Sequence, residues 1–210
     1  MSEQPTFSVI IPTAGRQTLA RTLKRHRQAS RGDIEVLVVT DGDQPIAEEI
    51  ATRFDASLIT GPATRRWGNA QRQLGVERAR GRYLLFIDDD DGHALGAFRH
   101  IRRAVQREPG RIIIFRMRQN GVLIWRRPEL VEGNVGAPEF LVPNLPGKLG
   151  SWIETGERYE SDFDFLAGCV ALQGEPLWDR HVIALAPLPT RREWLRHTVR
   201  LRSRIRAWRG

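Results

Sequence analysis

The chain is poor in cysteine, in long apolar runs and in targeting signals. Cys169 is its only cysteine, so neither an intrachain disulfide nor a cysteine-based zinc site is available. No apolar run approaches the length of a membrane span. The segment from Met1 to Pro5 lacks the basic start and the apolar centre of a secretory signal peptide. Together these absences predict a cytoplasmic protein.

Two common nucleotide-binding fingerprints are also missing. The chain has no Gly-x-Gly-x-x-Gly motif and no Walker-type loop, which disfavours a dehydrogenase or a P-loop enzyme. Its composition is nevertheless globular, with 40% hydrophobic and 28% charged residues. A length of 210 residues suits one domain with a small appendage.

The positive charge is concentrated at the C-terminal end. The formal net charge is +8, and the eight arginines and one glutamate of 191–210 supply +7 of it, so 1–190 is nearly neutral. On a helix, four apolar residues of this tail form one stripe: Trp194, Leu201, Ile205 and Trp208. A basic amphipathic helix of this kind suits peripheral contact with an anionic membrane, packing on the body or, less well, nucleic acid.

Strands and helices alternate through the first half of the chain. The apolar pattern predicts strands over 7–11, 34–39, 56–59, 83–87, 111–117 and 122–125. It predicts helices over 17–28, 45–54, 68–79, 94–105 and 162–172. This alternation favours an α/β fold with a parallel sheet and right-handed crossovers. The second half changes to a hairpin across 119–121, and 129–150 shows no usable periodicity.

Four consecutive aspartates, Asp88 to Asp91, follow the apolar run that begins at Tyr83. Adjacent carboxylates at the end of a buried strand repel one another unless a cation neutralises them. A divalent metal that also holds a phosphorylated ligand would do so, because hard cations take carboxylate and phosphate oxygens together. The alternative is an acidic turn dissolved in water.

Polar residues follow three of the predicted strands. Thr13 ends the first strand, Asp41 ends the second, and the aspartates from Asp88 end the fourth. In an open parallel sheet these positions meet at one edge, where ligands bind. The convergence favours a ligand site over a solvated turn.

Four segments share their spacing with a known family. They are Phe7–Thr13, Ile34–Gly42, Arg72–Asp91 and the stretch that starts at Ser161. Together they resemble the family-2 glycosyltransferases of the GT-A fold. The resemblance implies a Rossmann-like, mostly parallel central sheet flanked by helices, with the basic amphipathic helix at the C-terminus.

The same resemblance implies a division of the chain. A GT-A glycosyltransferase domain would span 1–190, with a nucleotide-sugar-binding half at 1–118 and an acceptor-side half at 119–190. The basic tail at 191–210 would lie outside it.

The resemblance also assigns the donor-binding residues. Thr13, Asp41 and Arg72 match positions that hold the nucleobase and the ribose. Asp88 matches the first carboxylate of the DxD motif. Asp89, the middle residue of that motif, could also reach the ribose.

By the same resemblance, Asp90 matches the direct ligand of Mn²⁺ or Mg²⁺, and Asp162 matches the general base that deprotonates an acceptor hydroxyl. The implied reaction is inverting, metal-dependent transfer of a sugar from a nucleotide-diphosphate donor to a glycan, lipid-linked or other hydroxyl acceptor. Glu160 and Asp164 flank Asp162 and remain alternatives for the base, and Asp162 could instead be a helix N-cap.

The chain departs from the family pattern at several points. Ala14-Gly15, Gln73 and Ser161 stand where the family usually has Tyr-Asn, Asn and Glu. Two other functions stay open: a nucleotidyltransferase on a related fold, and a non-catalytic domain that binds nucleotide or nucleic acid through its tail.

Several other residues have two interpretations. His93 could complete a metal shell or make an ordinary polar contact, and Trp152 could stack on an acceptor sugar. We expect Trp125 and Trp178 to pack in the core. Three basic residues could clamp a diphosphate or be solvated: Arg65, Arg66 and Lys148.

Overall fold

The computed structural model describes residues 4–64, 67–125, 127–153 and 160–187. The predicted tail helix at 191–210 and the loop arginines Arg65 and Arg66 lie outside the described residues. The strands are β1 (Phe7–Thr13), β2 (Ile34–Asp41), β3 (Ser57–Gly61), β4 (Tyr83–Phe86), β5 (Gly92–His93), β6 (Ile113–Gln119), β7 (Val122–Leu123), β8 (Phe140–Pro143) and β9 (Leu177–Ala186). The helices are α1 (Leu19–Ala29), α2 (Pro45–Phe54), α3 (Asn69–Arg78), α4 (Ala97–Arg107), the short 3₁₀ helix η1 (Ala137–Glu139) and α5 (Ser161–Gln173).

The strands form one mixed sheet in the order β3-β2-β1-β4-β8-β6-β9-β5, with β7 paired to β6. The first four are parallel to one another, as the alternation of strands and helices predicted. Beyond β4 the pairing is mixed: β8 is antiparallel to both β4 and β6, whereas β9 is parallel to β6. The predicted α/β fold is confirmed, and its parallel part is the first half of the chain.

Three strands were not predicted: β5, β8 and β9. The first of them has only two residues, which is too short to produce a pattern. Charged residues interrupt the sequence of β9, and β8 lies within 129–150, where no periodicity was seen. The hairpin of β6 and β7 across 119–121 is confirmed.

Most predicted boundaries lie within two or three residues of the observed ones, and the predicted limits of α2 agree with the structure. β1, however, continues through Pro12 instead of ending before it. β1 pairs with β4 only from Phe7 to Ile10, so Pro12 lies where one side of the strand has lost its partner. A proline is tolerated there because no ladder donor is needed on that side.

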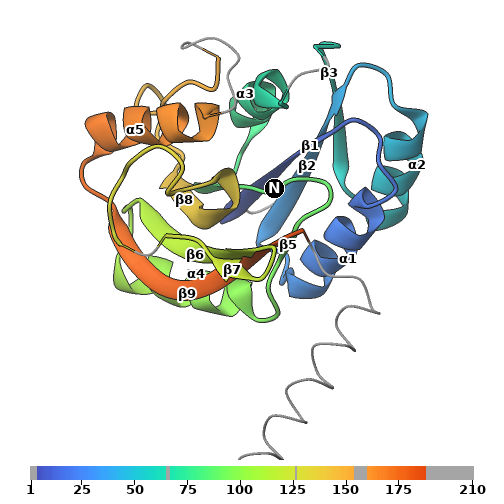
Figure 1. The fold of residues 1–210 in the computed structure, drawn as a ribbon. Helices are drawn as coiled ribbons and strands as arrows, with labels where there is room; N and C mark the ends of the chain where they lie inside the picture. The colour runs from blue at the N-terminus through green and yellow to red at the C-terminus, as the bar shows by residue number, and fades with distance from the viewer. Residues whose placement is uncertain (1–3, 65–66, 126, 154–159, 188–210) are drawn as a thin grey trace, which may run out of the picture.

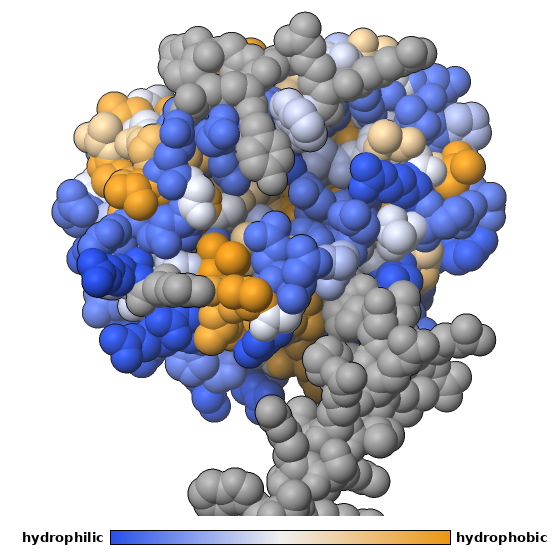
Figure 2. Space-filling model, in the orientation of Figure 1, coloured by the Kyte–Doolittle hydropathy of each residue, from blue (hydrophilic) through white to orange (hydrophobic). Residues whose placement is uncertain are grey.

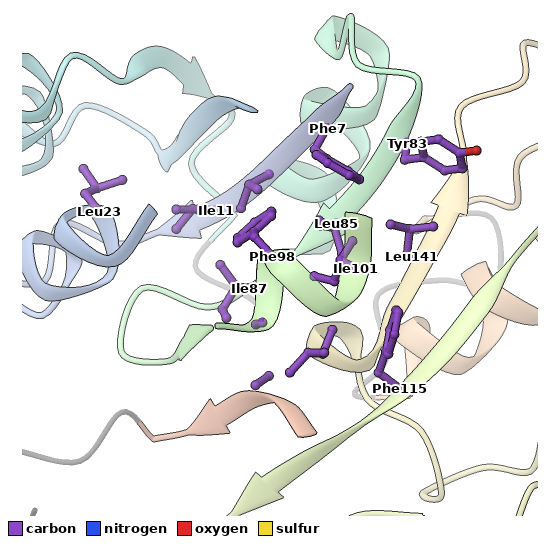
Figure 3. Packing of buried hydrophobic residues seen from close by; sticks show 14 of the residues in the cluster. Phe7, Ile11, Leu23, Tyr83, Leu85, Ile87, Phe98, Ile101, Phe115 and Leu141 are labelled. Carbon is purple, nitrogen blue, oxygen red and sulfur yellow. The ribbon is translucent and has the colours of Figure 1, made fainter. Parts of the chain in front are cut away.

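Helices cover both faces of the sheet (Figure 1), with α3 and α5 on one side and α1, α2 and α4 on the other. Phe98 and Ile101 of α4 pack among Phe7, Ile11 and Leu85 of the central strands (Figure 3). On the opposite face, α3 approaches β1 so closely that a Cβ at Gly75 would lie 2.4 Å from a methyl carbon of Ile10. Both faces of the parallel strands are therefore buried, which explains their continuous apolar sequence.

The surface in Figure 2 is mostly hydrophilic, with hydrophobic residues in small patches. Among the described residues, no helix has both the length and the apolar character needed to cross a bilayer.

Candidate functional site

Two adjoining cavities lie beyond the carboxyl ends of the parallel strands. The first, here called the strand-end pocket, has a volume of about 210 Å³ and is lined by Thr13, Arg16, Asp41, Gln71 and the turn Asp88–Asp90, among others. The second, here called the central cavity, has a volume of about 260 Å³ and extends toward β6, η1 and the start of α5. Both are lined by Trp67 and Asp88, so a ligand can span from one to the other.

A wider groove of about 750 Å³ continues from the strand-end pocket between the loops after β1 and β2. It shares Ala14, Arg16, Asp41 and Trp67 with that pocket. Trp67 therefore borders all three spaces, and 60% of its surface is exposed. Trp67 was not predicted as a site residue, because a single tryptophan beside arginines forms no sequence pattern that indicates ligand binding.

The aspartate turn is fixed by its own backbone and by α1. The Asp91 amide donates to the Asp88 carbonyl at 3.1 Å. The Thr22 hydroxyl of α1 lies 2.6 Å from the Asp91 carbonyl oxygen and 3.2 Å from that of Asp89. These contacts use the backbone, so the carboxylates are left to face other partners.

Within the turn, Asp89 points inward. Its Oδ2 accepts a 2.6 Å hydrogen bond from the Thr13 hydroxyl, and only 4% of the residue is exposed. Burial raises the pKa of Asp89, although the Thr13 hydroxyl and the charge of Arg16 oppose that shift. The two residues assigned to nucleoside binding thus contact each other, and together they form the floor of the strand-end pocket.

The carboxylates of Asp88 and Asp90 are more open, with 45% and 40% of their side chains exposed. Asp88 accepts a short hydrogen bond from the Arg72 guanidinium, and Asp90 lies 3.2 Å from Arg16. The Arg16 side chain is 59% exposed, so its ion pair is weak and a stronger cation can displace it.

Asp91 is nearly buried at 7% exposure and lines the central cavity beside Asp88. Burial raises its pKa to about 8, and the charges of Asp88, Asp90 and Asp89 add to the effect. The sequence placed Asp91 in the aspartate run but assigned it no separate role. A divalent cation nearby would oppose the part of the shift that comes from the neighbouring carboxylates.

The turn fits a metal held jointly with a ligand better than a metal held by protein alone. In the part of the chain that the structure describes, no three His, Cys, Asp or Glu side chains are grouped to bind a metal by themselves. Mg²⁺ and similar cations are commonly bound by one or two carboxylates together with substrate phosphates. The open carboxylates of Asp88 and Asp90 match that donor set.

Asp41 stands across the strand-end pocket from the aspartate turn. Its Oδ1 accepts a 2.6 Å hydrogen bond from the Thr64 amide and a 3.2 Å bond from the Gln71 side chain. The Oε1 of Gln71 is buried and has no hydrogen-bond partner. These contacts hold the Asp41 carboxylate at the wall of the pocket.

Arg72 lies in the central cavity and does not line the strand-end pocket with Thr13 and Asp41. It donates to the Trp67 carbonyl oxygen at 2.7 Å and to Asp88, and its guanidinium carbon lies 5.1 Å from the centre of the Trp152 ring. Only 8% of its side chain is exposed. Arg72 is thus placed beside the Asp88 carboxylate, at the boundary of the two cavities.

Asp162 lies in the first turn of α5 and lines the central cavity together with Asp88 and Asp91. Burial raises its pKa, which the Phe163 amide and the charge of Arg72 partly offset. The N-cap of α5 is Glu160, so the interpretation of Asp162 as an N-cap is wrong. Of the two alternative bases, Glu160 lines the cavity, whereas Asp164 does not.

The departures from the family pattern hold this region together. Ser161 accepts a 2.9 Å hydrogen bond from Asn69, which joins the N-terminal ends of α5 and α3. Gln73 accepts a 3.2 Å bond from the Trp152 amide. The first contact joins α5 to α3 directly, and the second holds Trp152, which stacks on Phe165 of α5.

The structure decides between the two interpretations of Trp152 and of His93. Trp152 is only 1% exposed and stacks on Phe165, with the ring centres 4.7 Å apart, so it packs in the core and cannot stack on a sugar. His93 is buried and lies 2.8 Å from His26, so it takes part in a histidine pair instead of a metal shell. The expected core packing is confirmed for Trp125, which is 3% exposed, whereas Trp178 is partly buried and packs against that core, with its ring centre 5.1 Å from that of Trp125.

A further carboxylate, Glu139, lies beneath Asp162 with no exposed surface. Burial raises its pKa to about 8, and the charge of Asp162 adds to that shift. Glu139 was not predicted as a site residue. In the sequence, it could have been noticed as a single glutamate directly before the apolar run Phe140–Pro143.

Together, the sheet and the cavities define an α/β protein with a hollow at the carboxyl ends of its parallel strands, which is where open sheets of this kind bind ligands. Residues 8–147 match the family described as Glycosyl transferase family 2. Because this match covers more than half of the chain, the chain belongs to glycosyl transferase family 2. The resemblance inferred from the sequence is thereby confirmed.

One curated relative is EpsH of Bacillus subtilis (strain 168), which is named as a glycosyltransferase. It is 33% identical over 94 residues, which is 42% of this chain and 27% of EpsH. The chain thus spans about a quarter of that relative's length.

Solved structures share the fold at low sequence identity. S. aureus TarS matches 87% of this chain and 37% of its own, with a TM-score of 0.68 and 16% identity. TarS 1-349 in complex with UDP-GlcNAc matches at a TM-score of 0.61 and 16% identity, over 88% of this chain and 59% of its own. The mannosyltransferase PcManGT from Pyrobaculum calidifontis, in complex with GDP-Man and Mn²⁺, matches at a TM-score of 0.62 and 15% identity, over 91% of this chain and 59% of its own.

Proposed function

We propose that the protein is a metal-dependent, inverting glycosyltransferase that moves a sugar from a nucleotide-diphosphate donor to an acceptor hydroxyl. One observation carries the proposal: the cavity that holds Asp162 adjoins, through Asp88, the pocket formed by Thr13, Asp41 and Asp90. This arrangement allows one donor to extend from the nucleoside end to the base. The complexes of TarS with UDP-GlcNAc and of PcManGT with GDP-Man and Mn²⁺ are consistent with such a donor.

In this proposal the nucleoside occupies the strand-end pocket and the groove beside it. Asp41 would accept hydrogen bonds from the base or the ribose, because its carboxylate is held at the pocket wall by Thr64 and Gln71. Trp67, which borders all three spaces, offers an exposed ring face for stacking. The sugar would then lie in the central cavity, beyond Asp88.

Asp90, with Asp88 beside it, would hold Mn²⁺ or Mg²⁺ together with the diphosphate. The bound cation would stabilise the negative charge that grows on the leaving phosphate oxygen. Arg72 contributes a second positive charge at the same boundary, and its contacts with Asp88 and Trp67 fix its orientation.

Asp162 would accept the proton of the acceptor hydroxyl. It lines the same cavity as Asp88. In-line displacement with inversion would need the base on the face of the sugar opposite the leaving group. Burial raises its pKa, and a carboxylate of raised pKa is a stronger base. The identity of the acceptor and the membrane contact of 191–210 stay predictions.

Thermal melting with a panel of nucleotides and nucleotide sugars, each with and without Mn²⁺, tests the proposal. A ligand that binds only the folded protein raises its melting temperature by mass action. We expect a rise with one nucleoside diphosphate and its sugar, which is lost on chelation and in Asp90→Asn. If none of the nucleotides raises the melting temperature, a non-catalytic domain is favoured. Pyrophosphate release from a nucleoside triphosphate would identify a nucleotidyltransferase.

A further inference from the structure

Glu139 is a buried ionisable residue in the second half of the fold. It has no exposed surface, and it ends η1 directly before β8. Its two carboxylate oxygens accept hydrogen bonds from two separate segments: Oε1 from the Met117 amide at 3.2 Å, and Oε2 from the Gly136 amide at 2.7 Å. The side chain thus ties β6 to the segment 136–138.

The segment 136–138 is a wall of the central cavity, and it contacts Asp162 directly. Gly136, Ala137 and Pro138 all line that cavity. The backbone of Ala137 acts on the Asp162 carboxyl group and lowers its pKa by hydrogen bonding, although burial raises that pKa overall. A Cβ placed on Gly136 would lie 3.7 Å from both Asp162 Oδ2 and Glu139 Oε2, so the two carboxylates flank this glycine.

We propose that Glu139 is a positioning residue for the base Asp162, and that it acts by fixing the Gly136–Ala137 backbone whose hydrogen bonding orients the Asp162 carboxylate. The proposal rests on the function proposed for Asp162. Glu139 lines neither cavity itself and contacts Met117 and Gly136, which line the central cavity, so it acts through Asp162 and not on the substrate.

Stability alone does not explain a glutamate at this position. A carboxyl group without exposure costs free energy even when it is hydrogen-bonded, and an apolar side chain of similar volume would fill the space. What an apolar side chain would not provide is the link between the Met117 and Gly136 amides. The link keeps one wall of the cavity in register with β6, and small displacements of a catalytic group reduce rates strongly.

Glu139→Gln is the first test, because it keeps the size of the side chain. It replaces one acceptor oxygen with an NH₂ group, which cannot accept a hydrogen bond from the backbone amide that faces it. We expect kcat to fall by about tenfold to a hundredfold, as for a small misplacement of a catalytic group. The KM for the donor should change by less than about twofold, because Glu139 does not line the strand-end pocket. Equal changes in kcat and KM, or no loss of kcat, would overturn the proposal.

Val142→Ala is the matched control for lost stability. Val142 is fully buried in β8, pairs with Leu84, and does not line the central cavity. We expect it to lower the melting temperature while kcat stays within about twofold of the original. A loss of kcat as large as that of Glu139→Gln would mean that Glu139 has only a structural role.

Gly136→Ala tests the same wall independently, should Glu139→Gln fail to fold. Its backbone φ of −115° suits any residue, and the nearest atom to the new methyl group is the flexible end of Met117 at 3.0 Å. We expect kcat to fall with little change in the donor KM. An unchanged kcat in this variant would overturn the proposal.

A double-mutant comparison distinguishes the positioning role of Glu139 from the proposed role of Asp162 as the base. In the Asp162→Asn background, Glu139→Gln should change the residual transfer by less than about twofold, because its effect passes through the missing carboxylate. Independent, multiplying losses would overturn the positioning role while leaving the proposed function intact. Normal transfer by Asp162→Asn alone would overturn both.

Discussion

The two halves of the sheet reach the same site by different means. In the first half, parallel strands deliver Thr13, Asp41 and Asp88 to one edge simply by ending there. In the second half, mixed strands and loops place Asp162 through individual contacts such as Ser161 with Asn69. The first mechanism follows from topology alone, whereas the second depends on particular side chains. The comparison suggests that donor binding belongs to the first half and base catalysis to the second.

The largest effect tests the second half. Asp162→Asn should reduce sugar transfer by about a thousandfold or more, because the acceptor hydroxyl loses its proton acceptor. The affinity for the donor, measured by calorimetry, should stay within about threefold, since Asp162 lies outside the strand-end pocket. Asp164→Asn is the matched control on the same helix, and its transfer rate should stay near that of the original. If Asp164→Asn were inactive while Asp162→Asn stayed active, Asp164 would be the base instead of Asp162.

The next effect tests the first half. Asp90→Asn should cut metal-dependent turnover by at least about a hundredfold, in line with the loss of one transition-state charge contact. Unlike the base variant, it should also weaken donor binding in the presence of Mn²⁺. Turnover assayed across a Mn²⁺ titration checks this. Retention of more than about a third of the original turnover would refute the metal assignment.

A third test concerns the contact between His26 of α1 and His93 of β5, which joins the two halves. Burial lowers the pKa of His26 from 6.5 to about 4, so the unfolded chain takes up a proton before the native protein does. The stabilising contribution is therefore present above pH 6.5 and is lost as the pH falls toward 4. The full shift corresponds to about 3 kcal/mol.

His26→Gln should remove that pH dependence. Urea unfolding at pH 7 and at pH 4.5 should show a smaller loss of unfolding free energy in His26→Gln than in the original protein. An equal loss in both would mean that His26 is not held neutral in the native state.

The smallest expected effect is that of Trp67→Ala. Removing an exposed stacking surface should weaken nucleotide binding by about tenfold, corresponding to 1–2 kcal/mol for an aromatic contact. Trp67→Phe keeps a ring and should lose less than about threefold. Competition with a fluorescent nucleotide gives both affinities, and equal affinities for all three proteins would remove Trp67 from the nucleotide site.

The sequence predicted the first half well because each strand there is a continuous apolar run that ends in a polar residue. The positions of Thr13, Asp41 and the aspartates follow from the rule that parallel strands end at one edge. Within the turn, however, no pattern shows which carboxylate is buried. Asp89 faces Thr13, and Asp91 lines the central cavity; both depend on the direction of each side chain.

The second half was harder to predict because its order comes from long-range contacts. β8 has only four residues, and its partners β4 and β6 lie far away in sequence. Glu139 is also held by residues of a different element, so its local sequence does not reveal its role. The departures at Gln73 and Ser161 likewise acquire a meaning only when their partners are seen.

The division of labour between the two halves is tested most directly by measuring donor affinity and sugar transfer together on Asp90→Asn and Asp162→Asn. The experiment uses the full chain, Mn²⁺ and the nucleotide sugar that melting identifies. We expect Asp90→Asn to lose both metal-dependent binding and transfer, and Asp162→Asn to keep binding while losing transfer. Loss of donor binding in Asp162→Asn, or normal transfer by either variant, would contradict the account.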